Sequence, residues 1–246
     1  METSDEFVFS WNNLRAEYLK LLEAGYTFLK CSDYAEALSQ GLPLPKLAVV
    51  SRVDVDLSPA KADRLREILD GLGIKASFFV RLHALEYNPF SFENYRIFRS
   101  IMHSGHELGL HTEIIDASTI WQEDARACFE RDLAAFECIF GARPIGTAAH
   151  GGATGLNNLD FWKTHTPEEF GQLYEAYSES ESFSLFQDSI YVSDSEWTRW
   201  KSYDGGRLQQ GDRRSPSAIA ENKPPLIYML VHPDTYFDRH CYERDR

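Results

Sequence analysis

Short apolar runs alternate with segments of helical periodicity along most of the chain. The most continuous apolar runs lie at 46–56, 74–80 and 225–231. Such runs are typical of parallel strands that are buried on both faces. Weaker strands are predicted at 26–30, 106–111, 145–149 and 190–192.

Apolar residues spaced three and four apart predict helices between these strands. We expect helices at 11–24, 32–39, 58–71, 95–104 and 123–140. Two segments rich in Gly, Pro and polar residues predict loops. These are 151–182, with one helix near 167–177, and 205–224.

The alternation of strands and helices predicts a parallel sheet with crossover helices. We expect this α/β sheet to form a closed or nearly closed barrel rather than an open sheet, and the length of 246 residues is ordinary for a barrel. One domain should span 1–246, with a helical lead-in at about 1–45. Active residues in such folds lie at the carboxyl ends of the strands.

Three charged residues share one face at the end of the first strong strand. They are Arg52, Asp54 and Asp56, spaced two apart. Two close carboxylates suit a divalent cation, or a base beside a metal ligand. The alternative is that they cap the following helix and pair with Arg52.

Two histidines border the predicted strand at 106–111. Alternation along the strand directs His111 and His106 to opposite faces. His111 falls at the carboxyl end, beside the aspartates if the two strands are neighbours. His106 is expected to be a structural, hydrogen-bonding histidine.

Two further histidines follow apolar strands. His232 ends the strand at 225–231, and an imidazole at the mouth of a buried strand is suited to general acid or base catalysis. His150 precedes two glycines, which let the backbone approach a ligand closely. A simple turn histidine is the alternative for His150.

The composition excludes several classes of function. A net charge of −13 and a pI of about 5.0 disfavour binding to nucleic acid or to an anionic membrane. We find no apolar run long enough for a transmembrane segment and no signal-peptide pattern at 1–9. The four scattered cysteines, Cys241 among them, are typical of reduced thiols. We therefore expect a cytoplasmic protein.

The sequence also lacks the common nucleotide and serine-hydrolase motifs. It contains no GxGxxG, no GxxxxGK[ST] and no GxSxG. Aromatic and polar residues instead gather at 191–200, where Trp197 is a candidate for stacking on a sugar ring. A partly buried loop with anchoring tryptophans is the alternative for that segment.

The order of these segments resembles the polysaccharide deacetylases, the NodB-homology group of carbohydrate esterase family four, and its WbmS-like branch in particular. The matching stretches are RVDVDLSP (52–59), GIKASFFV (73–80), YNPF (87–90), GHELGLHT (105–112), SDS (193–195) and LVHP (230–233). The resemblance runs from near Trp11 to His232.

The resemblance implies a distorted (β/α) barrel that removes acetyl groups from acetylated sugars with a bound divalent metal. It implies that Asp54 activates water and that Asp56 and His111 bind the metal. His232 would then protonate the leaving amine. Asp194, in the SDS stretch, is the candidate partner that keeps His232 charged.

The chain departs from the family pattern at three places. Val55 separates aspartates that are adjacent in the better-known members, so the roles of base and ligand can be exchanged. Ile115 occupies the position of a second histidine ligand. A TAAHG stretch at 147–151 replaces an Arg-Pro-Pro-Tyr-Gly-like loop, and its His150 can supply the third ligand. Glu113 and Asp116 are the alternative substitutes.

Together these features predict a metal-dependent hydrolase, with zinc as the expected cation. Its substrate would be an N-acetylated sugar of a surface polysaccharide or a precursor of one. Arg52, Asp194 and Trp197 are the expected substrate-binding residues. One rival is a non-catalytic carbohydrate-binding homologue, which Ile115 favours. The other is an Asp-x-Asp phosphatase with Asp54 as its nucleophile, which leaves the histidines unexplained.

Overall fold

A curved, mostly parallel sheet forms the centre of the structure, a computed structural model that describes residues 7–180, 183–240 and 243. The strands are β1 (Thr27–Leu29), β2 (Ala48–Val55), β3 (Ser77–Arg81), β4 (Glu107–Thr112), β5 (Gly146–Ala149), β6 (Tyr174–Glu175), β7 (Ile190–Ser193), β8 (Lys201–Asp204), β9 (Arg207–Leu208) and β10 (Leu226–Val231). Their order is β6-β5-β4-β3-β2-β10-β7-β8-β9, and β1 pairs with the start of β2.

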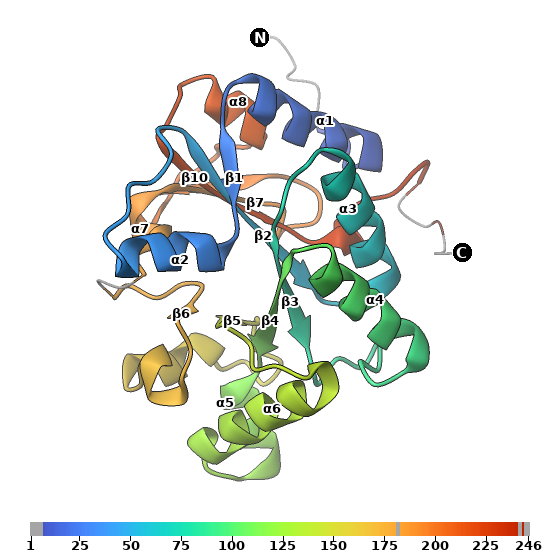
Figure 1. Ribbon diagram of the computed structural model, residues 1–246, viewed down its shortest axis with the longest axis vertical. Helices are drawn as coiled ribbons and strands as arrows, with labels where there is room; N and C mark the ends of the chain where they lie inside the picture. The colour runs from blue at the N-terminus through green and yellow to red at the C-terminus, as the bar shows by residue number, and fades with distance from the viewer. Residues whose placement is uncertain (1–6, 181–182, 241–242, 244–246) are drawn as a thin grey trace.

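Helices surround this sheet, and α1, α3, α4 and α6 follow one another around its outside (Figure 1). The α-helices are α1 (Trp11–Glu23), α2 (Cys31–Ser39), α3 (Pro59–Gly71), α4 (Phe92–His103), α5 (Ile114–Trp121), α6 (Ala125–Phe140), α7 (Leu185–Asp188) and α8 (Pro216–Ala220). The 3₁₀ helices are η1 (Asn158–Lys163), η2 (Pro167–Phe170) and η3 (Pro233–Thr235). Within the described residues, no helix combines the length and the apolar character needed to cross a membrane.

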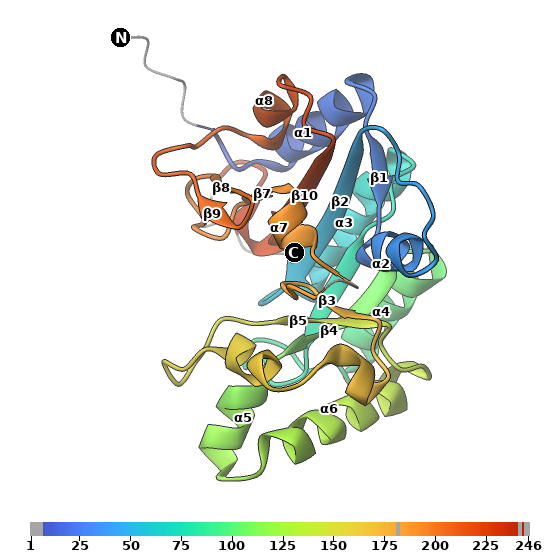
Figure 2. The same ribbon diagram turned by 90° about the vertical axis from the view of Figure 1, so that its left-hand side faces the viewer.

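The strands from β6 to β7 run parallel, and they confirm the predicted distorted α/β barrel. Between β6 and β7 the barrel is bridged by side chains, because the hydroxyl groups of Tyr177 and Tyr191 lie 3.1 Å apart. Tyr228 also donates a hydrogen bond to the carbonyl of Ala176 across this gap. β8 and β9 extend the sheet as an antiparallel hairpin at its edge (Figure 2).

Alternation along the strands divides the apolar residues into two clusters on opposite faces of the sheet. Val49, Val53 and Val55 of β2 belong to the larger cluster, which packs against the outer helices. Val50 belongs to the smaller, inner cluster with Phe79 and several tyrosines. The polar residues of β2 that follow Val50 at intervals of two are thereby directed into the barrel.

Gly109 of β4 allows the ring of Phe79 to fill the inner face. A side chain at Gly109 would meet this ring at a distance that Cβ atoms essentially never show. Phe79 in turn lies 5.4 Å from the Arg52 guanidinium, measured to its ring centroid. The ring therefore forms part of the floor beneath the residues at the barrel mouth.

Several local predictions differ from the structure. The helix expected near 167–177 is wrong, because only Pro167–Phe170 is helical and Gly171, with a φ of 71°, ends it before β6 begins. The loop expected at 205–224 contains β9 and α8. Cys31, Cys128 and Cys138 are free thiols, whereas Cys241 lies outside the described residues.

His106 makes the structural contacts that its position predicts. Its Nδ1 accepts a hydrogen bond from the backbone N–H of Ala76 (3.0 Å), and its Nε2 lies 3.3 Å from Asp70. Because Nδ1 acts as an acceptor, the ring is neutral with its proton on Nε2. Burial outweighs the effect of Asp70 and lowers the pKa of His106 to about 4.

His106 should make the protein less stable as the pH falls from about 6.5 to about 4. In this range the unfolded chain takes up a proton at His106 and the folded chain does not, which corresponds to about 3 kcal/mol. His106→Asn keeps an acceptor for Ala76 and does not titrate, so its free energy of unfolding should fall less over this range. Urea denaturation at several pH values measures the difference. The exposed His103→Asn is the control, and equal slopes in wild type and His106→Asn would contradict the prediction.

Candidate active site

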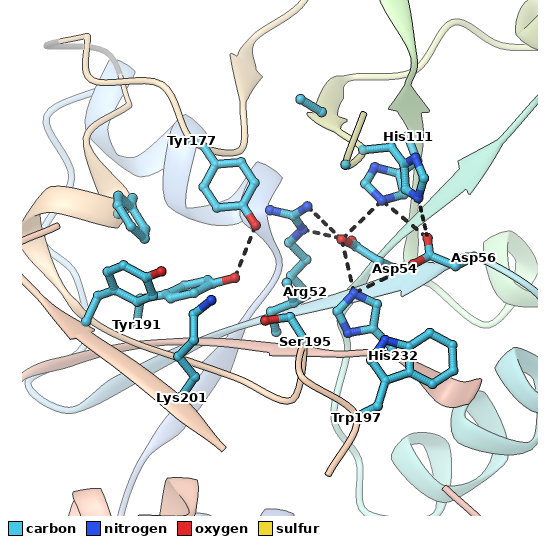
Figure 3. A pocket seen from close by; sticks show the side chains of 16 residues that line it. Arg52, Asp54, Asp56, His111, Tyr177, Tyr191, Ser195, Trp197, Lys201 and His232 are labelled. Carbon is cyan, nitrogen blue, oxygen red and sulfur yellow. Dashed lines mark hydrogen bonds and ion pairs between the residues drawn. The ribbon is translucent and has the colours of Figure 1, made fainter. Parts of the chain in front are cut away.

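A cavity of about 450 Å³ opens at the carboxyl ends of the central strands (Figure 3). It is lined by Arg52, Asp54, Asp56, His111, Ala149, His150, Gly151, Tyr177, Phe186, Tyr191, Ser195, Trp197, Lys201, Tyr203, Leu230 and His232. The parallel register explains this convergence. Val53 pairs with Val231, and His111 pairs with Ala148, so polar residues from β2, β4, β5 and β10 reach the same level.

Arg52 and Asp54 form a bidentate ion pair inside the barrel. Arg52 donates from Nε to Oδ1 of Asp54 (2.8 Å) and from Nη2 to Oδ2 (2.7 Å). The guanidinium also donates to the Tyr228 hydroxyl (3.3 Å) and lies 4.5 Å from the centroid of the Tyr177 ring. Burial opposes the charge on Asp54, but Arg52 and then His111 outweigh burial and hold the pKa of Asp54 well below its usual range.

His111 lies between the two carboxylates of β2. Its Nδ1 is 2.7 Å from the carbonyl of Ala148, and this contact directs Nε2 toward Asp54 (3.2 Å) and Asp56 (3.4 Å). Burial alone would lower the pKa of His111, but Asp54 and Asp56 raise it to about 10. The carboxylates therefore favour positive charge at this point of the cavity.

His150 approaches the same group from the loop after β5. Its Nε2 lies 3.9 Å from Oδ1 of Asp56, and its ring meets that of His111 edge to face with centroids 5.1 Å apart. On its other side, Nδ1 lies 3.4 Å from Glu113, which accepts a hydrogen bond from Arg81 (2.8 Å). A carboxylate behind a histidine is the usual arrangement for orienting a metal ligand.

Asp56, His111 and His150 can hold a metal ion. Each offers one ligand atom, and these atoms all lie within 4.8 Å of one another. Ligands arranged tetrahedrally at about 2.0–2.2 Å from a zinc-like ion stand about 3.3–3.6 Å apart. The distances from Asp56 to His111 (3.4 Å) and to His150 (3.9 Å) are close to that spacing. Oδ1 of Asp56 is buried and has no hydrogen-bond partner in the part of the chain that the structure describes. The residues therefore fit a divalent cation.

The alternative ligands have other contacts. Asp116 accepts hydrogen bonds from the backbone N–H groups of Ala153 and Thr154 and from Asn158. Ile115 packs against the outer hydrophobic cluster. Glu113 is held by Arg81, as described above, so its contacts match those of a residue that orients His150.

His232 faces the carboxylates from the opposite side to His111 (Figure 3). Only 7% of its surface is exposed, yet it lines the cavity, and its Nε2 lies 3.8 Å from Asp56 and 4.0 Å from Asp54. Its Nδ1 lies 2.6 Å from Asp194. Burial opposes a charge on His232, but Asp194 outweighs burial and raises the pKa of His232 to about 9.

Asp194 and Arg52 differ in how they meet the cavity. Asp194 is fully buried behind His232 and accepts hydrogen bonds from the His232 backbone N–H as well. It is not among the residues that line the cavity, so its contact is with His232. Arg52 does line the cavity, but its guanidinium is directed toward Asp54.

Trp197 lies at the rim of the cavity in an uncommon backbone conformation. Its φ of 64° is in the left-handed region, which is costly for a bulky residue and often found at functional sites. The N–H of Trp197 donates to the carbonyl of Asp194 (2.8 Å), which closes the turn. The side chain is 45% exposed and can therefore contact a ligand.

The sequence indicated the far end of the cavity only in part, because Tyr191 belongs to the segment 191–200 whereas Tyr177, Lys201 and Tyr203 were not singled out. Tyr177, Tyr191, Tyr203 and Lys201 line it, and they come from β7, β8 and the loop after β6. In β8, Lys201 and Tyr203 alternate with the buried Ser202, but this pattern was too short to recognise in the sequence.

Comparisons with known proteins give weak structural similarities. No protein-family model matches the chain, and no curated protein matches it. The chitin deacetylase of the fungal pathogen Colletotrichum lindemuthianum aligns with 41% of this chain and 45% of its own, at 21% identity and a TM-score of 0.32. A mutant of BA3943, a CE4 family pseudoenzyme with restored enzymatic activity, aligns with 78% of this chain and 58% of its own, at 17% identity and a TM-score of 0.46.

A third structure covers more of both chains. The Streptococcus pyogenes deacetylase PplD, in complex with acetate, aligns with 90% of this chain and 82% of its own, at 13% identity and a TM-score of 0.49. Because all three TM-scores lie below 0.5, we take the function from the geometry of the cavity.

Asp194→Asn should lower the pKa of His232 from about 9 toward or below its ordinary value of 6.5, because burial remains while the favourable charge is lost. NMR titration of the histidine ring protons in cation-free protein measures this value. His83, whose pKa is raised by Asp132, is the internal control and should titrate unchanged. An unchanged titration of His232 would exclude Asp194 as the cause of its charge.

Proposed function

We propose that this protein is a metal-dependent hydrolase that removes the acetyl group from the nitrogen of an acetylated sugar. One observation carries the proposal: the Asp56, His111 and His150 group shares a cavity with the Asp54 carboxylate and the His232 imidazole. Amide hydrolysis needs a group that accepts a proton from water and a group that gives one to the departing nitrogen. This cavity offers both beside a cation site.

The cation that we propose is zinc. One carboxylate and two imidazoles form a ligand set that zinc commonly takes in hydrolases, with a position left open. The chemistry that such an ion supplies is Lewis acidity, which polarises the acetamide carbonyl and makes water more acidic. Glu113 would orient His150, and the carbonyl of Ala148 would orient His111.

Asp54 is the proposed general base. It lines the cavity beside Asp56, and the two hydrogen bonds from Arg52 hold its carboxylate in one orientation. Asp54 would accept a proton from the attacking water as the new bond to the acetyl carbon forms. We propose that Arg52 positions this base and keeps it ionised beforehand.

His232 is the proposed general acid. The contact with Asp194 favours the charged imidazole, so a proton is available on Nε2 at neutral pH. Transfer of this proton to the sugar nitrogen would accompany breakage of the C–N bond and give a free amine and acetate. Trp197 at the rim would stack on the sugar ring, and we take a surface polysaccharide or its precursor as the source of the sugar.

Asp54→Asn should lower the rate of acetate release by about 10²- to 10⁴-fold and leave zinc affinity largely unchanged, because Asn keeps the shape but is not a base. Asp56→Asn should lose both activity and zinc. Acetate assays on N-acetylated oligosaccharides and zinc titration of each variant test these outcomes. Loss of zinc from Asp54→Asn would mean that Asp54 is the metal ligand and Asp56 the general base. If the zinc-loaded wild type binds these sugars but releases no acetate, the protein is a carbohydrate-binding protein and not a hydrolase.

His232→Ala should reduce kcat/KM for an N-acetylated sugar far more than for an activated aryl acetate. An amine leaves only with a proton, whereas a phenolate of low pKa leaves without one. Parallel kinetics on the two substrates, at equal zinc content, measure the difference. Equal losses on both would mean that His232 shapes the cavity without acting as an acid.

A further inference from the structure

The cavity has two ends of different chemistry. The cation site, Asp54 and His232 occupy one end. At the other end lie the tyrosines and Lys201, and Figure 3 shows the Lys201 ammonium directed to the tyrosine side. Lys201 is not used by the proposed hydrolysis.

The charge of Lys201 is weakly compensated. The nearest carboxylate oxygen in the described structure is Oε1 of Glu196, at 4.0 Å, and Glu196 also pairs with Arg199. The Lys201 side chain is 28% exposed and lines the cavity, where its ammonium lies 5.4 Å from the centroid of the Tyr203 ring. Arg52, by contrast, has no exposed surface and is fully engaged by Asp54. Of the two described Lys and Arg side chains that line the cavity, Lys201 is therefore the one available to a ligand.

Lys201 also lines a second, smaller cavity of about 290 Å³. Its other charged wall residues are Arg199, Arg213, Glu196 and Asp212, of which Arg199 pairs with Glu196. Segment 196–214 contains five Lys and Arg residues against three Asp and Glu residues, whereas the whole chain contains 25 against 38. The local excess of positive charge lies beside the cavity of a strongly acidic protein, where it favours an anionic ligand.

We propose that the acetylated sugar is itself anionic and carries a carboxylate or a phosphate group that Lys201 binds. The ammonium would make a charge-assisted hydrogen bond to this group, which is stronger when water is partly excluded. The two ends of the cavity thus orient the sugar, with its anion at Lys201 and its acetamide at the histidines. The acetamide end rests on the proposed function; the anion end rests on Lys201 and its surroundings.

Calorimetric titration of the purified full chain at low ionic strength tests the proposal by binding and not by turnover. The probes are N-acetylglucosamine, which is neutral, its C6 carboxylate analogue N-acetylglucosaminuronic acid, and N-acetylglucosamine 1-phosphate. At least one anionic probe should bind about tenfold or more tightly than the neutral sugar. The two anionic probes distinguish a carboxylate on the sugar from a phosphate at its reducing end.

Lys201→Gln should abolish the preference for the anion, and Lys201→Arg should retain it. Arg207→Gln is the matched control, because it removes the same charge from the same hairpin at an exposed position that lines neither cavity. Equal affinity for neutral and anionic probes, an anion preference that survives in Lys201→Gln, or no binding of either anionic probe at millimolar concentration would overturn the proposal.

The result is separable from the proposed hydrolysis. Anionic sugars that bind through Lys201 but release no acetate would leave the anion site intact and reject the hydrolase. Acetate release from neutral sugars, without any anion preference, would do the reverse.

Discussion

The ion pair between Arg52 and Asp54 is the interaction on which the barrel mouth depends. The guanidinium of Arg52 has no exposed surface and lies on the inner face of the sheet between Phe79, Tyr177 and Tyr228. This buried charge is tolerated because the guanidinium donates hydrogen bonds to Asp54 and to the Tyr228 hydroxyl. Removing either Arg52 or Asp54 would leave the other charge unpaired and would lower the free energy of unfolding by about 3–5 kcal/mol. The pair therefore couples the folding of the barrel to the ionised state of Asp54.

Negative charge accumulates around this pair, and the surrounding histidines compensate it. His111 and His232 lie on either side of the two aspartates, and the pKa of each histidine is raised by carboxylates against the opposing effect of burial. When a cation binds beside these carboxylates, a histidine ligand has to release its proton, so the cation would replace the positive charge of the imidazole.

Ile115 and His150, two positions at which the sequence departs from the pattern of the deacetylases it resembles, have different surroundings. Ile115 offers no ligand atom and joins the hydrophobic core, while His150 reaches the same group from the loop after β5. Glu113, two residues before Ile115, contacts His150 and is held by Arg81. In the proposed cation site, His150 would thus take the place of the ligand that the resemblance implies at position 115, and Glu113 would support it.

The sequence alone determined the main strands and the placement of Asp54, His111 and His232 at their carboxyl ends. Long apolar runs and alternation are local properties, so β2, β4 and β10 could be located without knowledge of their neighbours. Short elements such as β8, β9 and α8 escaped this reasoning because a few residues carry no readable period. For the same reason the helix expected beyond Phe170 was wrong.

Only the tertiary structure decided which of these residues meet and what each contacts. Distances between positions a hundred residues apart depend on strand register and on the curvature of the sheet, and neither is a local property. His150 rather than Asp116 joins His111 because the loop after β5 folds over β4, while Asp116 is taken up by backbone N–H groups. Lys201 reaches the cavity because β8 pairs with β7, which in turn lies beside β10, the strand that His232 follows.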